Sequence, residues 1–292
     1  MLDDDKGPSK KAVLRWGENV AEIYLFGAHI WRWYSSGAER LWQSTLSVMD
    51  GSAPLRGGLP IAWPQFADLG KLPLHGFART QEWEVVDTHP GADEVSVTLE
   101  LSHSEVTQGL WPFEFKLQYQ VRLSKACLGV ELTVMNTGSR PFPFTTCLHT
   151  YFRVPSIDDV AIRGLEGCSY VDKVDGFAKK VEEHEELLPE RAATESKGFC
   201  DRVYAGAPDT LVLEDRGRAE RFSITQTTSH PNTVIFNPWI EGKKGDKGPD
   251  YDDDGYKYAI CVEPAIADDP LTLEPGKVWT GSQVILVEPL AT

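Results

Sequence analysis

The segment EVSVTLELS at residues 94–102 alternates apolar and polar side chains, and so do FKLQYQVRL at residues 115–123 and LGVELTV at residues 128–134. A period of two places the apolar side chains on one face of a β-strand. Shorter stretches extend the pattern toward both ends of the chain, at residues 12–16, 21–26, 222–225, 234–236, 258–262 and 284–287. The sequence therefore predicts an all-β protein of stacked antiparallel sheets, not alternating βαβ units.

Helices are expected to be few and short, because 19 Pro and 25 Gly are spread along the chain. Residues 39–48, after a Ser-Ser-Gly turn, are the best helical candidate. Residues 179–188 are a second candidate, but they lack an apolar stripe and fit a loop or strand as well. Within them, the acidic run EEHEE at residues 182–186 predicts a solvated face.

Composition limits the classes of function. The 292 residues are 41% hydrophobic and carry a net charge of −15, which is typical of a globular protein and disfavours a nucleic-acid partner. No apolar run is long enough to span a membrane, and the first residues lack the features of a secretory signal. The five cysteines are widely spaced, so neither a zinc site nor a disulfide framework is indicated. We expect a cytoplasmic protein, monomeric by default.

The polar segment at residues 241–255 (EGKKGDKGPDYDDDG) predicts a mobile surface loop. Its Asp250-x-Asp252-x-Asp254 spacing imitates the start of a calcium-binding EF-hand loop. The twelfth position is Cys261 where an EF-hand has Glu, and a strand pattern follows where a helix is required, so an EF-hand is disfavoured.

Candidate chemistry resides in short polar segments set among aromatic residues and prolines. Nucleotide-binding and common hydrolase signatures are absent, so no cofactor is indicated. Polar groups beside aromatic rings are typical of sugar sites, because a pyranose has apolar faces and many hydroxyls. Taken one by one, Arg56, His75 and His149 also fit ordinary structural roles. Glu263, which closes an apolar run, fits either solvent exposure at a strand end or a carboxylate held in a pocket.

Six of these segments, in order, resemble the glucose-6-phosphate 1-epimerase branch of the galactose mutarotase-like superfamily. They run from Arg56 to Ala265 and read RGGLPIAWPQF, LPLHGFAR, LHTYFRV, CDRVYAG, FNPWIEG and ICVEPA. Flanking pieces near both ends extend the resemblance to nearly the whole chain. It implies one β-sandwich domain over residues 1–292, of which residues 1–11 are expected to form a flexible tail, with a sugar bound across an open cleft and no cofactor or metal.

The resemblance also implies roles for six residues. By similarity, His149 is the general acid and Glu263 the general base of anomer exchange through the open-chain aldehyde. Arg56 and Arg79 would bind a phosphate. Asp201 would hold sugar hydroxyls, and His75 would orient the ring.

Two positions depart from the related pattern. Leu74 stands where related sequences often have Gln, and Ala265 stands where Gly commonly follows the IEP element.

Two guanidinium groups in an acidic protein favour a hexose 6-phosphate as the substrate. The alternatives are an aldose 1-epimerase for unphosphorylated sugars with the same acid and base, and a non-catalytic carbohydrate-binding protein.

Overall fold

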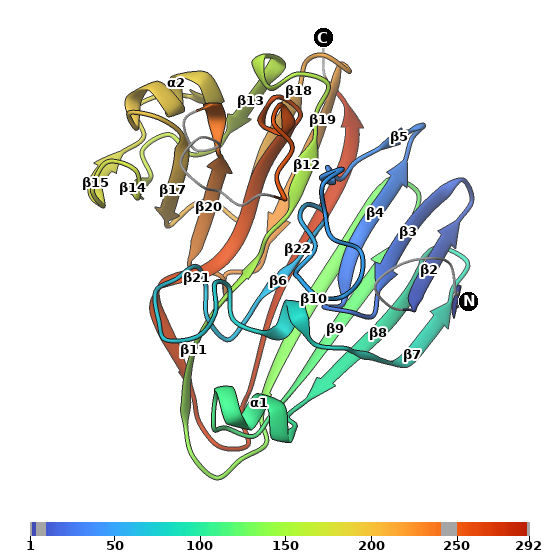
Figure 1. The fold of residues 1–292 in the computed structure, drawn as a ribbon. Coiled ribbons are helices and arrows are strands. Elements are labelled where there is room, and N and C mark those ends of the chain that lie inside the picture. Colours follow the sequence, from blue (N-terminus) through green and yellow to red (C-terminus); the bar gives the residue numbers. More distant parts are fainter. Residues whose placement is uncertain (1, 4–9, 241–249, 291–292) are drawn as a thin grey trace.

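Antiparallel strands make up most of the molecule, as Figure 1 shows. The structure, a computed structural model, describes residues 2–3, 10–240 and 250–290. Its strands form three sheets whose neighbours all pair antiparallel. The predicted fold class, an all-β protein with a large antiparallel β-sandwich and few helices, is confirmed.

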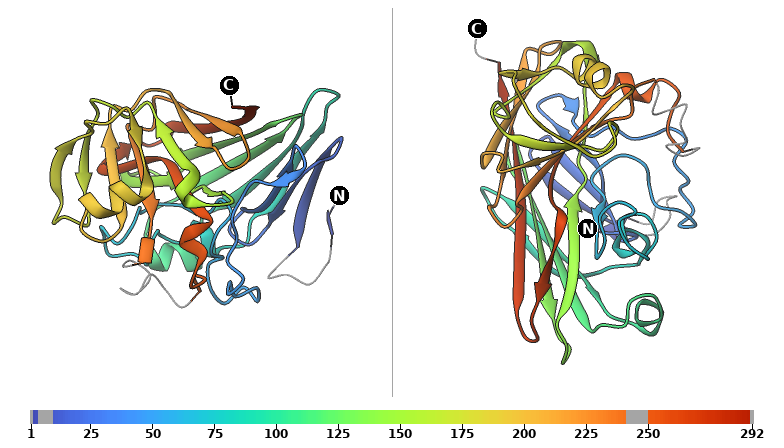
Figure 2. Two further views of the ribbon diagram at one scale, coloured as in Figure 1. Left: turned by 90° about the horizontal axis from the view of Figure 1, so that it is seen from above. Right: turned by 90° about the vertical axis from the view of Figure 1, so that its left-hand side faces the viewer.

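The five-stranded sheet contains the start of the chain, in the order β1-β2-β3-β4-β5. Its strands are β1 (Leu2–Asp3), β2 (Lys11–Trp16), β3 (Asn19–Tyr24), β4 (His29–Ser35) and β5 (Ala38–Glu39). Strands β2 and β3 contact β8 and β9 of the next sheet, and Figure 2 shows the blue strands lying alongside the green ones.

The nine-stranded sheet has the order β16-β13-β18-β19-β22-β10-β9-β8-β7. Its strands are β7 (Glu84–Pro90), β8 (Val95–Ser102), β9 (Phe115–Leu123), β10 (Cys127–Asn136), β13 (Val160–Arg163), β16 (Glu186–Leu187), β18 (Thr210–Asp215), β19 (Glu220–Gln226) and β22 (Val278–Pro289). Along β9 every second residue is buried, as its sequence alternation predicts.

The eight-stranded sheet has the order β15-β14-β17-β20-β21-β11-β6, and β12 also pairs with β21. Its strands are β6 (Ile61–Ala62), β11 (Phe142–Leu148), β12 (Tyr151–Arg153), β14 (Ser169–Asp172), β15 (Ala178–Val181), β17 (Cys200–Ala205), β20 (Asn232–Asn237) and β21 (Ala259–Leu273). One face of this sheet contributes to the main apolar core, which also takes side chains from the other two sheets.

Helices are short in the described part of the chain. The α-helices are α1 (Glu105–Leu110) and α2 (Pro189–Glu195), and the 3-10 helices are η1 (Ala78–Thr80), η2 (Ile157–Asp159) and η3 (Gly255–Lys257). The side chain of Ser104 accepts a hydrogen bond from the backbone N–H of Thr107 and so caps α1. No described helix has the length and apolar character needed to cross a bilayer.

The helix predicted at residues 39–48 is wrong. Strand β5 ends at Glu39, and Leu41 and Gln43 then form isolated β-bridges with Phe152 and Gly57. This backbone is extended because its polar groups pair with other strands, which a helix would prevent. Residues 179–188 are likewise not helical: they contain the end of β15 and all of β16.

The acidic run at residues 182–186 is only partly solvated, which corrects the predicted solvated face. Glu182 is 3% exposed and accepts hydrogen bonds from Arg202 (3.1 Å) and the hydroxyl of Tyr204 (2.8 Å). A carboxylate can be buried where such partners replace water. The expected flexible tail falls mainly on residue 1 and residues 4–9, which lie outside the described residues, whereas Leu2–Asp3 pairs with β2.

Candidate active site

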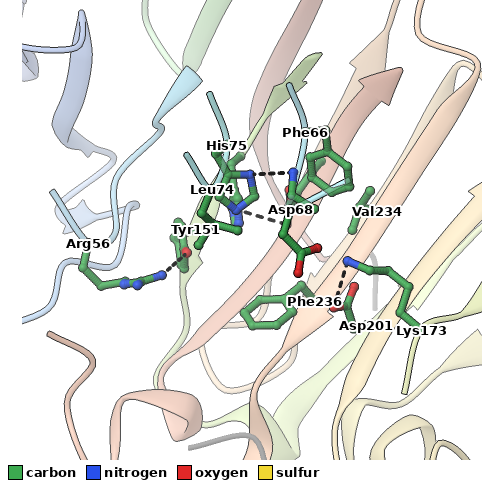
Figure 3. A pocket seen from close by; sticks show the side chains of 13 residues that line it. Arg56, Phe66, Asp68, Leu74, His75, Tyr151, Lys173, Asp201, Val234 and Phe236 are labelled. Atoms are coloured by element: carbon green, nitrogen blue, oxygen red, sulfur yellow. Dashed lines mark hydrogen bonds and ion pairs between the residues drawn. The ribbon is translucent and has the colours of Figure 1, made fainter. Parts of the chain in front are cut away.

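A pocket of about 380 Å³ opens on the face of the eight-stranded sheet that is turned away from the main core. Strand pairing places its side chains next to one another: Glu263 on β21 pairs with Val234 on β20, and Phe236 pairs with Asp201 on β17. The remaining lining residues are Arg56, Phe66, Ala67, Asp68, Leu74, His75, His149, Tyr151 and Lys173. Figure 3 shows most of these side chains converging on the pocket.

His149 and Glu263 lie side by side in the pocket. The Nδ1 atom of His149 is 3.2 Å from Oε1 of Glu263, and the two side chains are 11% and 1% exposed. Neither atom has a hydrogen-bond partner among the described residues, because the two groups are close but poorly aligned. The ring of Tyr151 stacks on the His149 ring, with centroids 4.6 Å apart and planes 3° apart. The imidazole is therefore held in one orientation while its polar atoms stay available.

Burial shifts the proton affinity of both groups. It raises the pKa of Glu263 well above that of an ordinary glutamate; the Cys147 thiol, which donates to Oε2 over 2.9 Å, works against this shift, and the charge of Asp201 adds to it. Burial lowers the pKa of His149, and the positive charges of Arg56, Arg79 and Lys173 lower it further. The pocket therefore favours a neutral imidazole beside a carboxyl group that binds a proton readily.

His75 lies next to the pair, with its ring centroid 5.3 Å from that of His149. Its Nδ1 atom accepts a hydrogen bond from the backbone N–H of Ala67 (3.2 Å). In the neutral ring the proton is then on Nε2. Burial lowers the pKa of His75, as do the charges of Arg79 and His149, so this residue can offer a neutral N–H donor to a bound molecule.

Arg56 supplies a cation at one end of the pocket. Its guanidinium group donates to both carboxylate oxygens of Asp250 at 3.2 Å and to the hydroxyl of Tyr151 at 3.4 Å. At the other end in Figure 3, the ammonium group of Lys173 is 3.2 Å from the carboxylate of Asp201 and 5.4 Å from the centre of the Phe66 ring.

Arg79 does not line the pocket. Its Nη2 atom donates to the carbonyl oxygen of Leu74 (2.7 Å), and Leu74 itself is a lining residue. Burial lowers the pKa of Arg79 to about 10, and the charge of Arg56 contributes to that shift. The structure thus brings five of the six predicted residues to the pocket and places Arg79 where it supports the backbone of Leu74 and adds positive charge nearby.

The paired glycines after Arg56 allow their segment to approach the backbone of neighbouring residues closely. A Cβ atom at Gly57 would lie 2.4 Å from the carbonyl oxygen of Trp42, and one at Gly58 would lie 2.3 Å from that of Ile30. Both residues have positive φ, at 102° and 64°. The glycines therefore let this segment pack against the backbone at Ile30 of β4 and at Trp42. That packing positions Arg56, the residue before the glycines.

Several site residues were not predicted from the sequence. Tyr151 lies in the LHTYF segment, where an aromatic two positions after His149 was a usable signal, because such residues share a face of a strand. Lys173 and Asp68 belong to no motif, and Asp250 stood out only through its calcium-like spacing, so only the fold places these residues at the site. Cys147 had a signal in hindsight, since it too is two positions from His149.

Comparisons with known proteins agree with this architecture. The aldose 1-epimerase family matches residues 11–286. A Cenchrus ciliaris protein named "Putative glucose-6-phosphate 1-epimerase" is 34% identical over 288 residues, covering 94% of this chain and 84% of its own. An Escherichia coli K12 protein of the same name is 35% identical over 258 residues, covering 85% and 80%.

A solved structure shows the same fold. The structure of "a putative mutarotase (YeaD)" from Salmonella typhimurium superimposes with a TM-score of 0.85 and 30% identity, covering 96% of this chain and 90% of its own. The fold is therefore galactose mutarotase-like, and the chain belongs to the aldose 1-epimerase family.

Proposed function

We propose that this protein interconverts the α and β anomers of a hexose 6-phosphate, with glucose 6-phosphate as the first choice. The observation that carries the proposal is the pairing of His149 with Glu263, 3.2 Å apart, in a pocket that also holds the guanidinium group of Arg56. The relatives named glucose-6-phosphate 1-epimerase support the same substrate.

Glu263 is the base of the proposed reaction. Opening a pyranose requires removal of the proton on the anomeric hydroxyl while the ring oxygen gains one. A carboxylate whose pKa is raised by burial is a stronger base than an exposed one, which brings its proton affinity nearer to neutral pH. The Cys147 thiol and the strand position of Glu263 hold the carboxylate in place.

His149 is the acid that protonates the ring oxygen. The same proton transfers run in reverse when the aldehyde rotates and the ring closes on its other face. Burial lowers the pKa of this histidine, and the charges of Arg56, Arg79 and Lys173 lower it further. A phosphate dianion paired with Arg56 offsets that positive charge, so the bound substrate itself would raise the pKa of His149 toward the protonated form that catalysis needs.

Phosphate recognition rests on Arg56. A guanidinium group presents two parallel N–H donors to an oxyanion. Here two donors of Arg56 hold the carboxylate of Asp250, and in the proposed complex a phosphate takes the place of that carboxylate. Asp201, His75 and Asp68 are available for sugar hydroxyls, and Phe66 and Phe236 offer apolar surface to a sugar ring.

The test is anomer exchange measured by two-dimensional NMR with glucose 6-phosphate, glucose and galactose, in the wild type and in His149→Asn and Glu263→Gln. We expect accelerated exchange of glucose 6-phosphate that both substitutions abolish. Exchange of the free sugars alone would move the activity to an aldose 1-epimerase for unphosphorylated sugars. Binding of these sugars without any acceleration would instead indicate a carbohydrate-binding protein.

A further inference from the structure

Potential metal ligands gather at the floor of the pocket. A ring nitrogen of His149, the thiol of Cys261 and a carboxylate oxygen of Glu263 lie within 4.8 Å of one another, and all three residues are buried. The Cys147 thiol is 2.9 Å from Oε2 of Glu263. These donors form a set of two sulfurs, one nitrogen and one carboxylate.

The sheet, not a loop, brings three of these donors together. Cys261 and Glu263 are alternate residues of β21, so both point to the pocket face. Cys147 on β11 pairs with Ala265, the next residue of β21 on that face, and His149 follows directly after the end of β11. Side chains on a paired strand keep their spacing without help from a bound ligand, so the cluster is preformed.

Two donor atoms of the cluster lack partners. The Nδ1 atom of His149 and the Oε1 atom of Glu263 are buried with no hydrogen bond among the described residues, and the residues are 8% and 1% exposed. Buried polar atoms normally have a partner, because leaving one unpaired costs free energy. Both residues line the pocket, so an ion can reach them from solvent.

The chemistry of the set selects the kind of ion. Thiolate, imidazole and carboxylate together are ligands of Zn²⁺ and other thiophilic divalent cations, at bond lengths of about 2.0–2.3 Å. Donors within 4.8 Å of one another need only small side-chain rotations to close on such an ion. We propose that His149, Cys261 and Glu263, with Cys147 beside them, form an inhibitory site for a thiophilic divalent cation such as Zn²⁺ or Cd²⁺.

The charges around the cluster act on this ion in both directions. On binding, the S–H bond of Cys261 is replaced by a sulfur–metal bond, and that proton leaves to solvent together with any proton held by Glu263, with no change of oxidation state. One thiolate and one carboxylate neutralise the two charges of the ion. Cation binding is opposed by the positive charges that act on His149, those of Arg56, Arg79 and Lys173. It is favoured by the negative charge of Asp201, which acts on Glu263.

Binding is tested with Cd²⁺ alone, followed by the ultraviolet charge-transfer absorption of a thiolate–cadmium bond. We expect the wild type to gain this band up to one equivalent of metal, and Cys261→Ala to lose it. Cys200→Ala is the matched control, because Cys200 is equally buried in a strand of the same sheet but its thiol belongs to the opposite, core face. Cys261→Ser repeats the test with less change in volume if the alanine variant folds poorly.

A band of equal strength in the wild type and in both Cys261 variants, or no band in the wild type, would overturn the site.

The inhibitory role rests on the proposed function and is measured separately. We expect Zn²⁺ to slow anomer exchange of glucose 6-phosphate in the wild type and Cys200→Ala, a chelator to restore it, and Cys261→Ala to resist inhibition. Exchange unaffected by zinc while Cd²⁺ still binds through Cys261 would refute inhibition. A protein that binds Cd²⁺ through Cys261 but accelerates no sugar keeps the metal site and loses the proposed enzyme.

Discussion

Strand β17 separates two buried charge clusters that have been built in opposite ways. Asp201 faces the pocket, while the next residue, Arg202, faces the other side, where it pairs with Glu182 at 3.1 Å and with Glu195 at 2.9 Å. We call Arg202, Glu182 and Tyr204 the paired cluster. Its members hydrogen-bond to one another, and the guanidinium group also donates to the carbonyl oxygen of Ala192 and lies 4.7 Å from the centre of the Tyr170 ring.

We call His149 and Glu263 the open cluster, because each keeps a buried polar atom without a hydrogen bond among the described residues. A buried charge with all its partners has nothing left to offer a ligand, and its worth is structural. A buried group that lacks partners stores a desolvation cost that a substrate, a proton or a metal ion can relieve. Burial alone therefore does not distinguish a catalytic carboxylate from a structural one, but hydrogen-bond satisfaction does.

The largest expected effect is the loss of activity in the open cluster. We expect His149→Asn and Glu263→Gln each to slow anomer exchange by about 10²–10⁴-fold, since each removes one of the two proposed proton-transfer groups. Glu182→Gln, a matched change in the paired cluster, should leave the exchange rate of the folded protein unchanged. Equal losses at Glu182 and Glu263 would erase the distinction between the two clusters.

Stability should respond in the reverse order. Arg202→Met leaves Glu182 buried without its cation, and we expect the free energy of unfolding to fall by about 3–5 kcal/mol. Chemical denaturation measures the loss. Arg216→Met is the control, because its guanidinium group is 41% exposed beside Glu186 and Glu214, and such surface pairs contribute about 0–1 kcal/mol. A denaturation midpoint equal to that of the control would show that the paired cluster is not structural.

Removing the arginine of the pocket should separate substrates. We expect Arg56→Ala to raise KM for glucose 6-phosphate by about 10–100-fold, since a hydrogen bond to a charged group contributes about 1.5–3 kcal/mol. The KM for free glucose should hardly change, because glucose has no phosphate to lose. Equal effects on both sugars would contradict phosphate recognition by Arg56.

The raised pKa of Glu263 predicts a pH dependence of stability. Below the unfolded-state value of about 4.3 the carboxyl group is neutral in both states, and its burial costs little. As pH rises through the higher folded-state pKa, the unfolded chain releases the proton first, so stability falls. Glu263→Gln should therefore raise Tm at neutral and alkaline pH and leave it unchanged at pH 4. Thermal melts across this range would detect the difference. A variant less stable than the wild type at pH 8 would show that the buried Glu263 carboxylate does not destabilise the folded state.

The smallest expected effect concerns the Cys147 thiol. Its S–H group donates to Glu263 and lowers the pKa of that carboxyl group. In Cys147→Ala the pKa should rise further, so the acid limb of the kcat/KM profile for anomer exchange should move to higher pH while the plateau is retained. A purely structural role for the thiol would lower activity or Tm without moving that limb.

Sequence reasoning predicted the fold class well because alternation is a local signal. In β9 and β10 the alternation of apolar and polar residues within each strand indicates which side chains are buried. The helix expected at residues 39–48 was wrong because Leu41 pairs with Phe152 of the distant strand β12 and Gln43 pairs with Gly57, beyond the end of the segment. Non-local pairing leaves no trace in a short window, and for the same reason the buried partner of Glu182 could not be seen in the run EEHEE.

The site divides along the same line. Five site residues lie in segments that resemble a known family, which is how the sequence indicated them. The structure places all five at one pocket: His149, Glu263, Arg56, His75 and Asp201. Lys173 and Asp250 reach the site only through folding, because Lys173 lies in no motif and the calcium-like spacing that contains Asp250 gives no link to Arg56. The placement of Arg79 beside Leu74 depends on a backbone carbonyl, which no side-chain pattern reports.

In β17, β20 and β21, alternate side chains lie on opposite faces of the sheet, so the pocket face can change independently of the core face. Val234, Phe236 and Glu263 face the pocket, whereas their immediate neighbours Ile235 and Val262 belong to the main core. Substitutions at one set of alternate positions can therefore explore new sugars, while the other set maintains the scaffold. An insertion or deletion of one residue would exchange the two sets, so a lineage or a library built on this sheet can vary by replacement but not by changing strand length.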